Sequence, residues 1–303
     1  MGAIAGTAVG VAVLAAAALW LTRGNVQPLK ALIAVWLAAL PVLGVGALLG
    51  RLGAMAAPVR PHRARQPPGT VDERMNRRSA EALVFMVKWP EPGRAKTRLC
   101  PPLSFADAAE LARAFLLDTL TEAAKTDADL LLAYAPEGAG DAFRSLVGSR
   151  AGLIEADADD LGGALSRAQA AALDLGYQRV ALVAADVPHL DTARYSEAFA
   201  ALDGADAVIG PSSDGGYYLL ATARRTPELF EGIAWSTDAV YGQTLAAAEE
   251  AGLRIATVAS CDDVDTAADL VWLLEELRRR PSAGHTLTVL DRVAGAVTGA
   301  AAD

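Results

Sequence analysis

The sequence predicts an α/β protein, a three-layer α/β/α domain with a mostly parallel sheet, preceded by an N-terminal transmembrane helical hairpin. Two observations lead to this prediction. From Ala82 onward, short apolar runs alternate with longer segments of helical periodicity, which is typical of βαβ units and a mostly parallel sheet. Apolar residues make up 53% of the 303 residues, and the surplus lies in the first fifty positions, where charge almost disappears.

The N-terminal segment contains two uncharged apolar stretches, 3–21 and 29–49. Each has about the ~20 residues that a helix needs to cross a bilayer. A cleaved signal peptide is the alternative for the first stretch, but a basic start is missing and the second stretch would remain. Arginines crowd the chain after position 50, so the positive-inside rule places the large domain in the cytoplasm. The predicted location is the inner, cytoplasmic membrane, with the lipid bilayer as a partner.

The chain then divides into four predicted parts. The hairpin covers 1–52, a basic Pro/Arg-rich linker covers 53–80, the α/β domain covers 81–280 and a tail covers 281–303. The net charge of −9 argues against a nucleic-acid partner, because the basic residues are gathered in one short region. Cys100 and Cys261 fit neither a disulfide framework nor a zinc spacing.

A basic loop follows the first apolar run of the α/β domain. Leu83 to Val87 reads as a short buried strand, because prolines and a glycine follow it and prevent helix continuation. The loop 96–99, Lys-Thr-Arg-Leu, comes next, and Ser104 is a good N-cap for the helix after it. Two cations and a hydroxyl at a strand–loop–helix junction can bind a di- or triphosphate. An ordinary solvated charge pair is the alternative.

Acidic residues follow three later strand candidates. Asp186 comes after 180–184, Asp214-Gly215-Gly216-Tyr217 after 208–210, and the cluster 262–265 after 255–258. Ligands of such sheets bind at the carboxyl ends of the strands, and carboxylates there can hold Mg²⁺ or Mn²⁺ against a diphosphate. Helix caps, or a plain hairpin turn at Asp-Gly-Gly, are the structural alternatives.

Taken in order, six motifs form a series that resembles a bacterial family of GT-A-like transferases. They are Lys-x-Pro-x-Pro-Gly-x-x-Lys-Thr-Arg-Leu (88–99), Asp-Leu-Gly (160–162), Asp-x-Pro (186–188), Asp-Gly-Gly-Tyr-Tyr (214–218), Trp-Ser-Thr (235–237) and Asp-Val-Asp-Thr (263–266). The family is labelled either as a domain of unknown function or as a radical-SAM/selenodomain-associated glycosyltransferase. It belongs to the nucleotide-diphospho-sugar transferase superfamily. The basic loop is also similar to that of 2-phospholactate guanylyltransferase.

The resemblance implies a GT-A (Rossmann-like) fold and a set of roles. Phosphate or nucleotide binding falls to Lys88, Gly93, Lys96, Thr97 and Arg98, and metal binding, with Mg²⁺ or Mn²⁺, to Asp186 and Asp265. Substrate or acceptor contacts fall to Asp160, Gly215, Gly216, Tyr217 and Trp235, and Asp214 is the candidate general base. Where many relatives have Asp-Leu-Gly-Glu-Arg, this chain has Gly163-Ala164 in place of the last two residues.

Three functions are compatible with these features. The first is a membrane-anchored, metal-dependent glycosyltransferase with a nucleotide-sugar donor and a small-molecule or lipid-linked acceptor. The second is a nucleotidyltransferase that uses a nucleoside triphosphate and releases pyrophosphate. The third is a non-catalytic, nucleotide-binding membrane module, favoured by the missing Glu-Arg pair.

Overall fold

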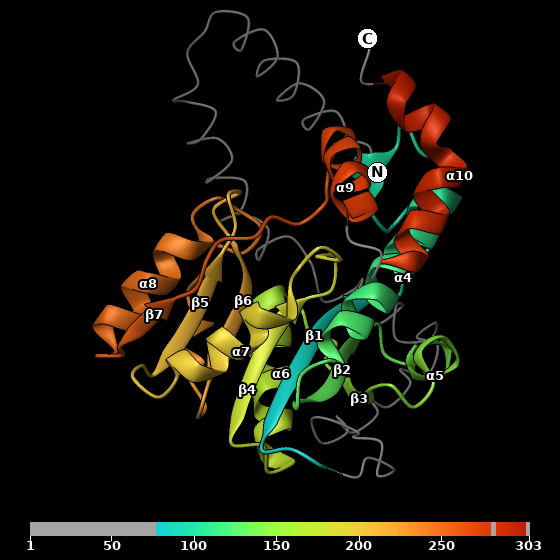
Figure 1. Ribbon diagram of the computed structural model, residues 1–303. Coiled ribbons are helices and arrows are strands. Elements are labelled where there is room, and N and C mark those ends of the chain that lie inside the picture. Colours follow the sequence, from blue (N-terminus) through green and yellow to red (C-terminus); the bar gives the residue numbers. More distant parts are fainter. Residues whose placement is uncertain (1–76, 280–282, 301–303) are drawn as a thin grey trace, which may run out of the picture. The chain divides into compact units, whose positions relative to one another are not determined.

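The computed structural model describes residues 77–279 and 283–300, and Figure 1 labels their elements. Seven strands form one sheet in the order β3-β2-β1-β4-β6-β5-β7. Their bounds are β1 Glu81–Lys88, β2 Asp129–Ala135, β3 Gly152–Glu155, β4 Arg179–Ala184, β5 Ala207–Pro211, β6 Tyr217–Thr222 and β7 Ile255–Thr257. β3 was not among the strands expected from the sequence.

The sheet is mixed, because one strand runs against the others. β1, β2, β3 and β4 pair in parallel, β7 pairs in parallel with β5, and β6 is antiparallel to both β4 and β5. A parallel pair needs a crossover connection of a dozen or more residues. Only a short turn separates β5 from β6, so these two strands form a hairpin.

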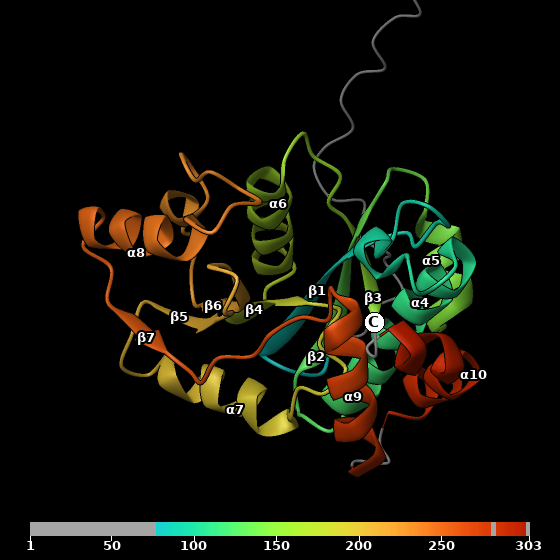
Figure 2. The ribbon, with the colours of Figure 1, turned by 90° about the horizontal axis from the view of Figure 1, so that it is seen from above.

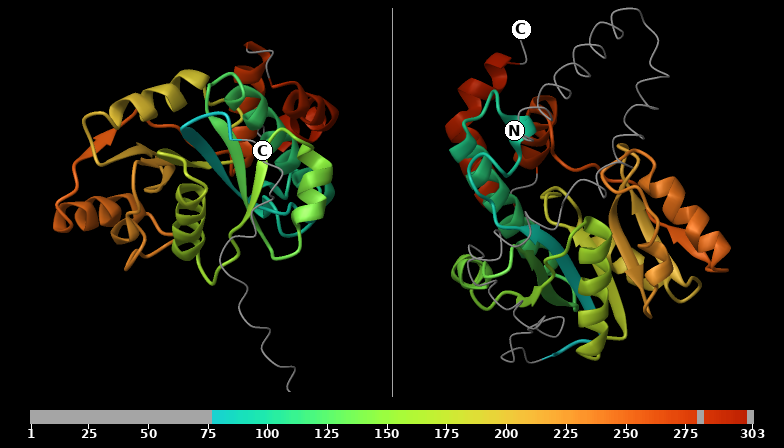
Figure 3. Two further views of the ribbon diagram at one scale, coloured as in Figure 1. Left: turned by 90° about the horizontal axis from the view of Figure 1, so that it is seen from below. Right: turned by 180° about the vertical axis from the view of Figure 1, so that it is seen from behind.

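Helices cover both faces of the sheet, as Figures 2 and 3 show from above and below. The helices are α4 Phe105–Ala123, α5 Gly140–Val147, α6 Leu161–Asp174, α7 Thr192–Ala201, α8 Val240–Glu250, α9 Ala267–Arg279 and α10 Gly284–Ala300. Alternate residues of a strand point to opposite faces. Leu83 and Phe85 of β1 accordingly pack with α4, α5 and α7, whereas Ala82 and Val84 pack with α6 and α8.

The C-terminal helices form a further apolar cluster. Leu273 and Leu277 of α9 and Leu290 of α10 pack with Leu111 and Phe115 of α4, and α10 runs beside α4 (Figure 1). Part of the segment predicted as a tail is therefore a packed helix. The predicted domain boundaries remain predictions.

The residues that the sequence marks as helix ends are found at helix ends in the structure. The Ser104 hydroxyl accepts a hydrogen bond from the Asp107 N–H at the start of α4, which satisfies one of the free donors of the first turn. After α6 and α8, Gly176 and Gly252 adopt the left-handed conformation, with φ of 90° and 68°, which glycine tolerates best.

The predictions of a transmembrane hairpin and of a location at the cytoplasmic membrane are corrected. No helix within 77–279 and 283–300 combines the length and the apolar character needed to span a bilayer. α9, for example, buries four leucines and carries charged residues at other positions. The two predicted spans, in 1–52, lie outside the described residues.

Candidate functional site

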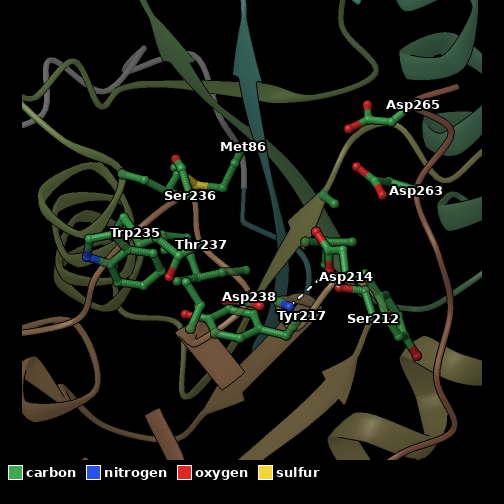
Figure 4. Close-up of a pocket in the computed structure, with 18 of the residues that line it drawn as sticks. Met86, Ser212, Asp214, Tyr217, Trp235, Ser236, Thr237, Asp238, Asp263 and Asp265 are labelled. Atoms are coloured by element: carbon green, nitrogen blue, oxygen red, sulfur yellow. Dashed lines mark hydrogen bonds between the residues drawn. The ribbon is translucent and has the colours of Figure 1, made fainter. Parts of the chain in front are cut away.

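A cavity of about 540 Å³ opens at the ends of β1, β4 and β5 (Figure 4). Figure 4 shows Asp263 and Asp265 on one side of it, Trp235 on the opposite side, and Asp214 and Tyr217 between them. Its described lining combines aliphatic, aromatic and acidic side chains: Met86, Arg98, Leu161, Leu165, Leu182, Val183, Ala184, Ser212, Asp214, Gly216, Tyr217, Tyr218, Trp235, Ser236, Thr237, Asp238, Val240, Asp263 and Asp265.

Three carboxylates meet at one end of the site. Asp186, Asp263 and Asp265 each have an oxygen within 4.8 Å of the other two. Asp186 lies two residues after the end of β4, whereas the other two belong to the segment between β7 and α9. The Val258 and Cys261 N–H groups donate to backbone oxygens of β5. The segment therefore continues beside β5 after β7 ends, and this brings its carboxylates to the end of β4.

Asp263 was not expected in this group from the sequence. A signal was present, because two aspartates separated by one residue in an extended segment point to the same side. Burial, followed by the charges of Asp186 and Asp265, raises the pKa of Asp263 to about 6. Close negative charges and partial burial both favour the protonated acid.

Lys96 is the buried cation of the cluster. Its ammonium Nζ donates to Asp186 Oδ2 and to Asp265 Oδ1, each at 2.6 Å, and its side chain is only 11% exposed. Burial by itself lowers the pKa of Lys96, but the two carboxylates outweigh this and hold the pKa above its ordinary value. The ammonium therefore stays charged. Arg98 also reaches Asp265, at 3.3 Å, but its side chain is 78% exposed.

The donor set fits a hard divalent cation. Mg²⁺ and Mn²⁺ prefer oxygen ligands, and carboxylates are the usual ones in proteins. The structure thus brings together the two residues predicted to bind metal, Asp186 and Asp265, adds Asp263, and places the ammonium of Lys96 between the predicted pair.

The turn from β5 to β6 forms another wall. Asp214 Oδ1 accepts hydrogen bonds from the Gly216 N–H, at 2.9 Å, and from the Ser212 hydroxyl. Gly215 has a φ of 86°, and a Cβ on it would lie 2.1 Å from the backbone oxygen of Asp238. The turn therefore needs a glycine, both for its left-handed backbone and for its close approach to the start of α8.

The far wall is aromatic. Trp235 lies edge-on to Tyr217, with ring centroids 6.4 Å apart and an interplanar angle of 80°. The indole also covers Gly162 of α6, where a Cβ would lie 2.2 Å from its Nε1. Ser236, the next residue, has a φ of 64°, which is uncommon for a residue other than glycine. Close packing and an unusual turn thus hold the indole in place.

Several predicted site residues lie elsewhere. Asp160 is the N-cap of α6, and its Oδ1 accepts the Gly163 N–H at 2.7 Å. Lys88 ends β1, and Gly93 lies in the turn that follows it with a φ of 79°. Thr97 begins the short 3-10 helix 97–99. None of these four belongs to the described lining of the cavity.

Comparison with known proteins agrees with this architecture. The family described as "uncharacterized protein conserved in bacteria (DUF2064)" matches residues 117–237. A crystal structure from Desulfovibrio desulfuricans G20, provisionally assigned as a nucleotide-diphospho-sugar transferase, is 32% identical, with a TM-score of 0.67 over 73% of this chain and 98% of that one. No curated protein matches the chain.

More remote structures are similar in part. A CMP-2-keto-3-deoxy-manno-octonic acid synthetase in complex with CTP is 11% identical, with a TM-score of 0.46 over 66% of this chain and 99% of that one. A nucleotidyl transferase from Methanothermobacter is 17% identical, with a TM-score of 0.45 and the same coverage. These two similarities are too distant to indicate a function.

The chain therefore shares the fold of the 32% identical structure, which is provisionally assigned as a nucleotide-diphospho-sugar transferase, and its acidic cluster and cations lie at the carboxyl edge of the sheet. Within that class, the chain belongs to the bacterial family DUF2064, as the resemblance of its motifs predicted. The matched segment includes Asp186, Asp214 and Trp235, whereas Lys96 and Asp265 lie outside it.

Proposed function

We propose that the chain is a metal-dependent glycosyltransferase that uses a nucleotide-sugar donor. The observation that carries the proposal is the meeting, in one place, of three carboxylates with Lys96 and Arg98 at the rim of a large cavity. The 32% identical relative, provisionally assigned as a nucleotide-diphospho-sugar transferase, supports it. The class of enzyme is a transferase, and the kind of group transferred is the proposed part.

In this proposal Asp186 and Asp265, with Asp263 beside them, hold Mg²⁺ or Mn²⁺. The chemistry that such an ion supplies is neutralisation of the negative charge on a leaving diphosphate. Lys96 and Arg98 contact the same phosphates, and fixed positive groups of this kind stabilise charge that develops in the transition state. Lys88, Gly93 and Thr97 are also proposed to contribute to the nucleotide site.

Asp214 is proposed to act on the acceptor. Its carboxylate is exposed at the cavity wall, and its Oδ1 is fixed by the Gly216 N–H. An acceptor hydroxyl attacks the anomeric carbon of the sugar, the bond from that carbon to the phosphate oxygen breaks, and the nucleoside diphosphate leaves with the electron pair. The hydroxyl proton passes to Asp214. A base must lie within hydrogen-bond reach of this proton.

The opposite wall is proposed to hold the acceptor. Trp235 and Tyr217 offer apolar ring faces beside the hydroxyls of Ser236 and Thr237. Aromatic faces combined with nearby polar groups suit a ligand with an apolar face and hydroxyls. Gly215 and Gly216 form the adjoining turn, and Asp160 acts indirectly, as the cap that starts α6 under Trp235.

The proposal is tested by incubating the purified chain with Mn²⁺ and either a panel of nucleotide sugars or nucleoside triphosphates. Release of nucleoside diphosphate with transfer of sugar is expected, and chelation of the metal should abolish it. Pyrophosphate release from a triphosphate would instead establish nucleotidyl transfer and refute the proposal.

A pair of variants sharpens this test. Asp186→Asn keeps the shape of the side chain but removes a carboxylate of the cluster, so transfer should fall about 10²–10³-fold. Asp174→Asn is the matched control, because Asp174 lies at the end of α6 and pairs on the surface with Arg225. Its activity should equal that of the wild type, and equal losses in both variants would contradict the assignment of the site.

A further inference from the structure

The backbone of Lys96 is unusual for its residue type. Its φ of 46° and ψ of 43° lie in the left-handed region, which is unfavourable for a residue with a Cβ. Such conformations persist when the surrounding contacts over-determine them, and they concentrate at functional sites. The backbone oxygen of Lys96 accepts the Leu99 N–H, and its ammonium donates two ionic hydrogen bonds, to Asp186 and to Asp265. The strained turn therefore delivers one positive charge to the acidic cluster.

This ammonium lies between the two carboxylates predicted to bind the metal. Both Nζ–Oδ distances are 2.6 Å, and the side chain is almost enclosed. The ammonium fills the space between these two oxygens, and its positive charge repels a second cation there, so the lysine and a metal compete for the same carboxylates. The third carboxylate, Asp263, has an oxygen within 4.8 Å of the same group, so the negative charge of the cluster exceeds the single buried ammonium.

We infer that Lys96 is a tethered cation that neutralises the acidic cluster until nucleotide arrives, and is then exchanged for the divalent ion. On exchange, the ammonium would leave Asp186 and Asp265, whose oxygens would then hold the metal, and it would turn to the phosphates of the donor. The phosphate half of this inference rests on the proposed function. The competition for the carboxylates rests only on the contacts of Lys96.

The exchange predicts opposite effects of Lys96 on the binding affinities for two ligands, Mn²⁺ and a diphosphate. A lysine that occupies the cluster about 90% of the time lowers the apparent affinity for a metal about tenfold, because only the remaining molecules can bind it. Removal of the ammonium should therefore tighten the binding of Mn²⁺ alone. It should also weaken the binding of a diphosphate to the Mn²⁺-loaded protein. A lysine that only supports the loop would not produce the first effect.

Arg98 offers a matched control for charge. It carries the same charge and also pairs with Asp265, but at 3.3 Å and with a side chain that is 78% exposed. Solvent screens an exposed pair strongly, and Arg98 does not fill the space between the carboxylates. Arg98→Met should therefore change the affinity for Mn²⁺ by less than about threefold, because an exposed pair contributes little.

The experiment is calorimetric titration of the full chain with Mn²⁺, without nucleotide, followed by titration of the Mn²⁺-loaded protein with inorganic pyrophosphate. Lys96→Met is expected to bind Mn²⁺ about tenfold more tightly than the wild type and pyrophosphate more weakly. Lys96→Gly is the second variant, because glycine accepts the left-handed backbone and so protects the fold. Circular dichroism checks that both variants are folded.

The inference is overturned if folded Lys96→Met and Lys96→Gly bind Mn²⁺ no more tightly than the wild type, or if Arg98→Met gains as much as they do. Unchanged pyrophosphate binding in the lysine variants would equally overturn it. These readouts are separate from sugar transfer. A wild type that transfers sugar, with no gain in Mn²⁺ affinity in the variants, refutes the exchange alone, whereas the gain without any transfer supports the exchange and refutes the proposed function.

Discussion

The contact between Gly162 and Trp235 allows a quantitative test of how the aromatic wall is built. Gly162 is the second residue of α6, and a Cβ added there would lie 2.2 Å from the Trp235 Nε1 and 2.8 Å from the backbone oxygen of Phe230. Real Cβ atoms are not found so close to other heavy atoms. In Gly162→Ala the indole and the loop before it must therefore move away from α6.

The expected cost follows from two opposing effects. Alanine in place of glycine inside a helix stabilises by up to about 1 kcal/mol. Overpacking of a filled site costs about 1–3 kcal/mol, and the upper end applies here because one of the clashing atoms belongs to the backbone. The net effect is a destabilisation of about 2 kcal/mol, which lowers the melting temperature by roughly 4–8 °C for a protein of this size.

The assay is thermal and urea unfolding of Gly162→Ala beside a matched control, Gly242→Ala. Gly242 also lies in a helix, α8, but nothing is within 4 Å of the position of its Cβ. The control should therefore be as stable as the wild type or more stable, by up to about 1 kcal/mol. If Gly162→Ala is stabilised as much as the control, the close packing of Trp235 on α6 is refuted.

Two further predictions concern buried and partly buried polar groups. Gln169→Leu should destabilise the folded protein by about 1–3 kcal/mol, because the buried Thr226 N–H loses its acceptor, Gln169 Oε1. Urea unfolding measures this, and an unchanged midpoint would show that this hydrogen bond is dispensable. Burial alone raises the pKa of Glu122, but Lys125 and Thr192 outweigh it and hold that pKa below its ordinary value of 4.5. Because the folded pKa is the lower one, charged Glu122 stabilises above pH 4.5 and loses this contribution as the pH falls through the folded pKa. Glu122→Gln should thus be less stable than the wild type at neutral pH and should approach it in acid, and a difference that does not vary with pH would contradict this.

Much of the fold was predictable because it depends on local patterns. Apolar runs followed by prolines or glycines mark the strands, and Ser104 and Gly176 mark helix ends through their own hydrogen bonds and backbone preferences. β3 was missed because its sequence, Gly-Leu-Ile-Glu, contains only two apolar side chains between a glycine and a glutamate, too few to form an apolar run. The membrane hairpin was predicted from apolar length alone, and no described helix has that character.

The Asp-Gly-Gly segment shows what local sequence patterns can predict and what they cannot. Its composition indicated either a plain turn or a wall of a ligand site, and the structure shows a turn that lies at a cavity. Asp214, Gly215 and Gly216 connect β5 to β6, and Asp214 and Gly216 also border the cavity. The insertion of β6 between β4 and β5 was not predictable from the turn, because a hairpin specifies its own two strands but not the next neighbour in the sheet.

The sequence by itself indicated which residues after the strands are candidates for the chemistry: Lys96, Asp186, Asp214 and Asp265 were all singled out by the apolar runs and motifs around them. Only the tertiary structure decided which of them meet. Lys96 is 90 residues from Asp186 and 169 from Asp265, and their contact depends on the order of the strands and on the path of the chain beside β5. Local patterns contain no information on such distances, so a lysine expected to bind phosphate was found between the carboxylates expected to bind metal.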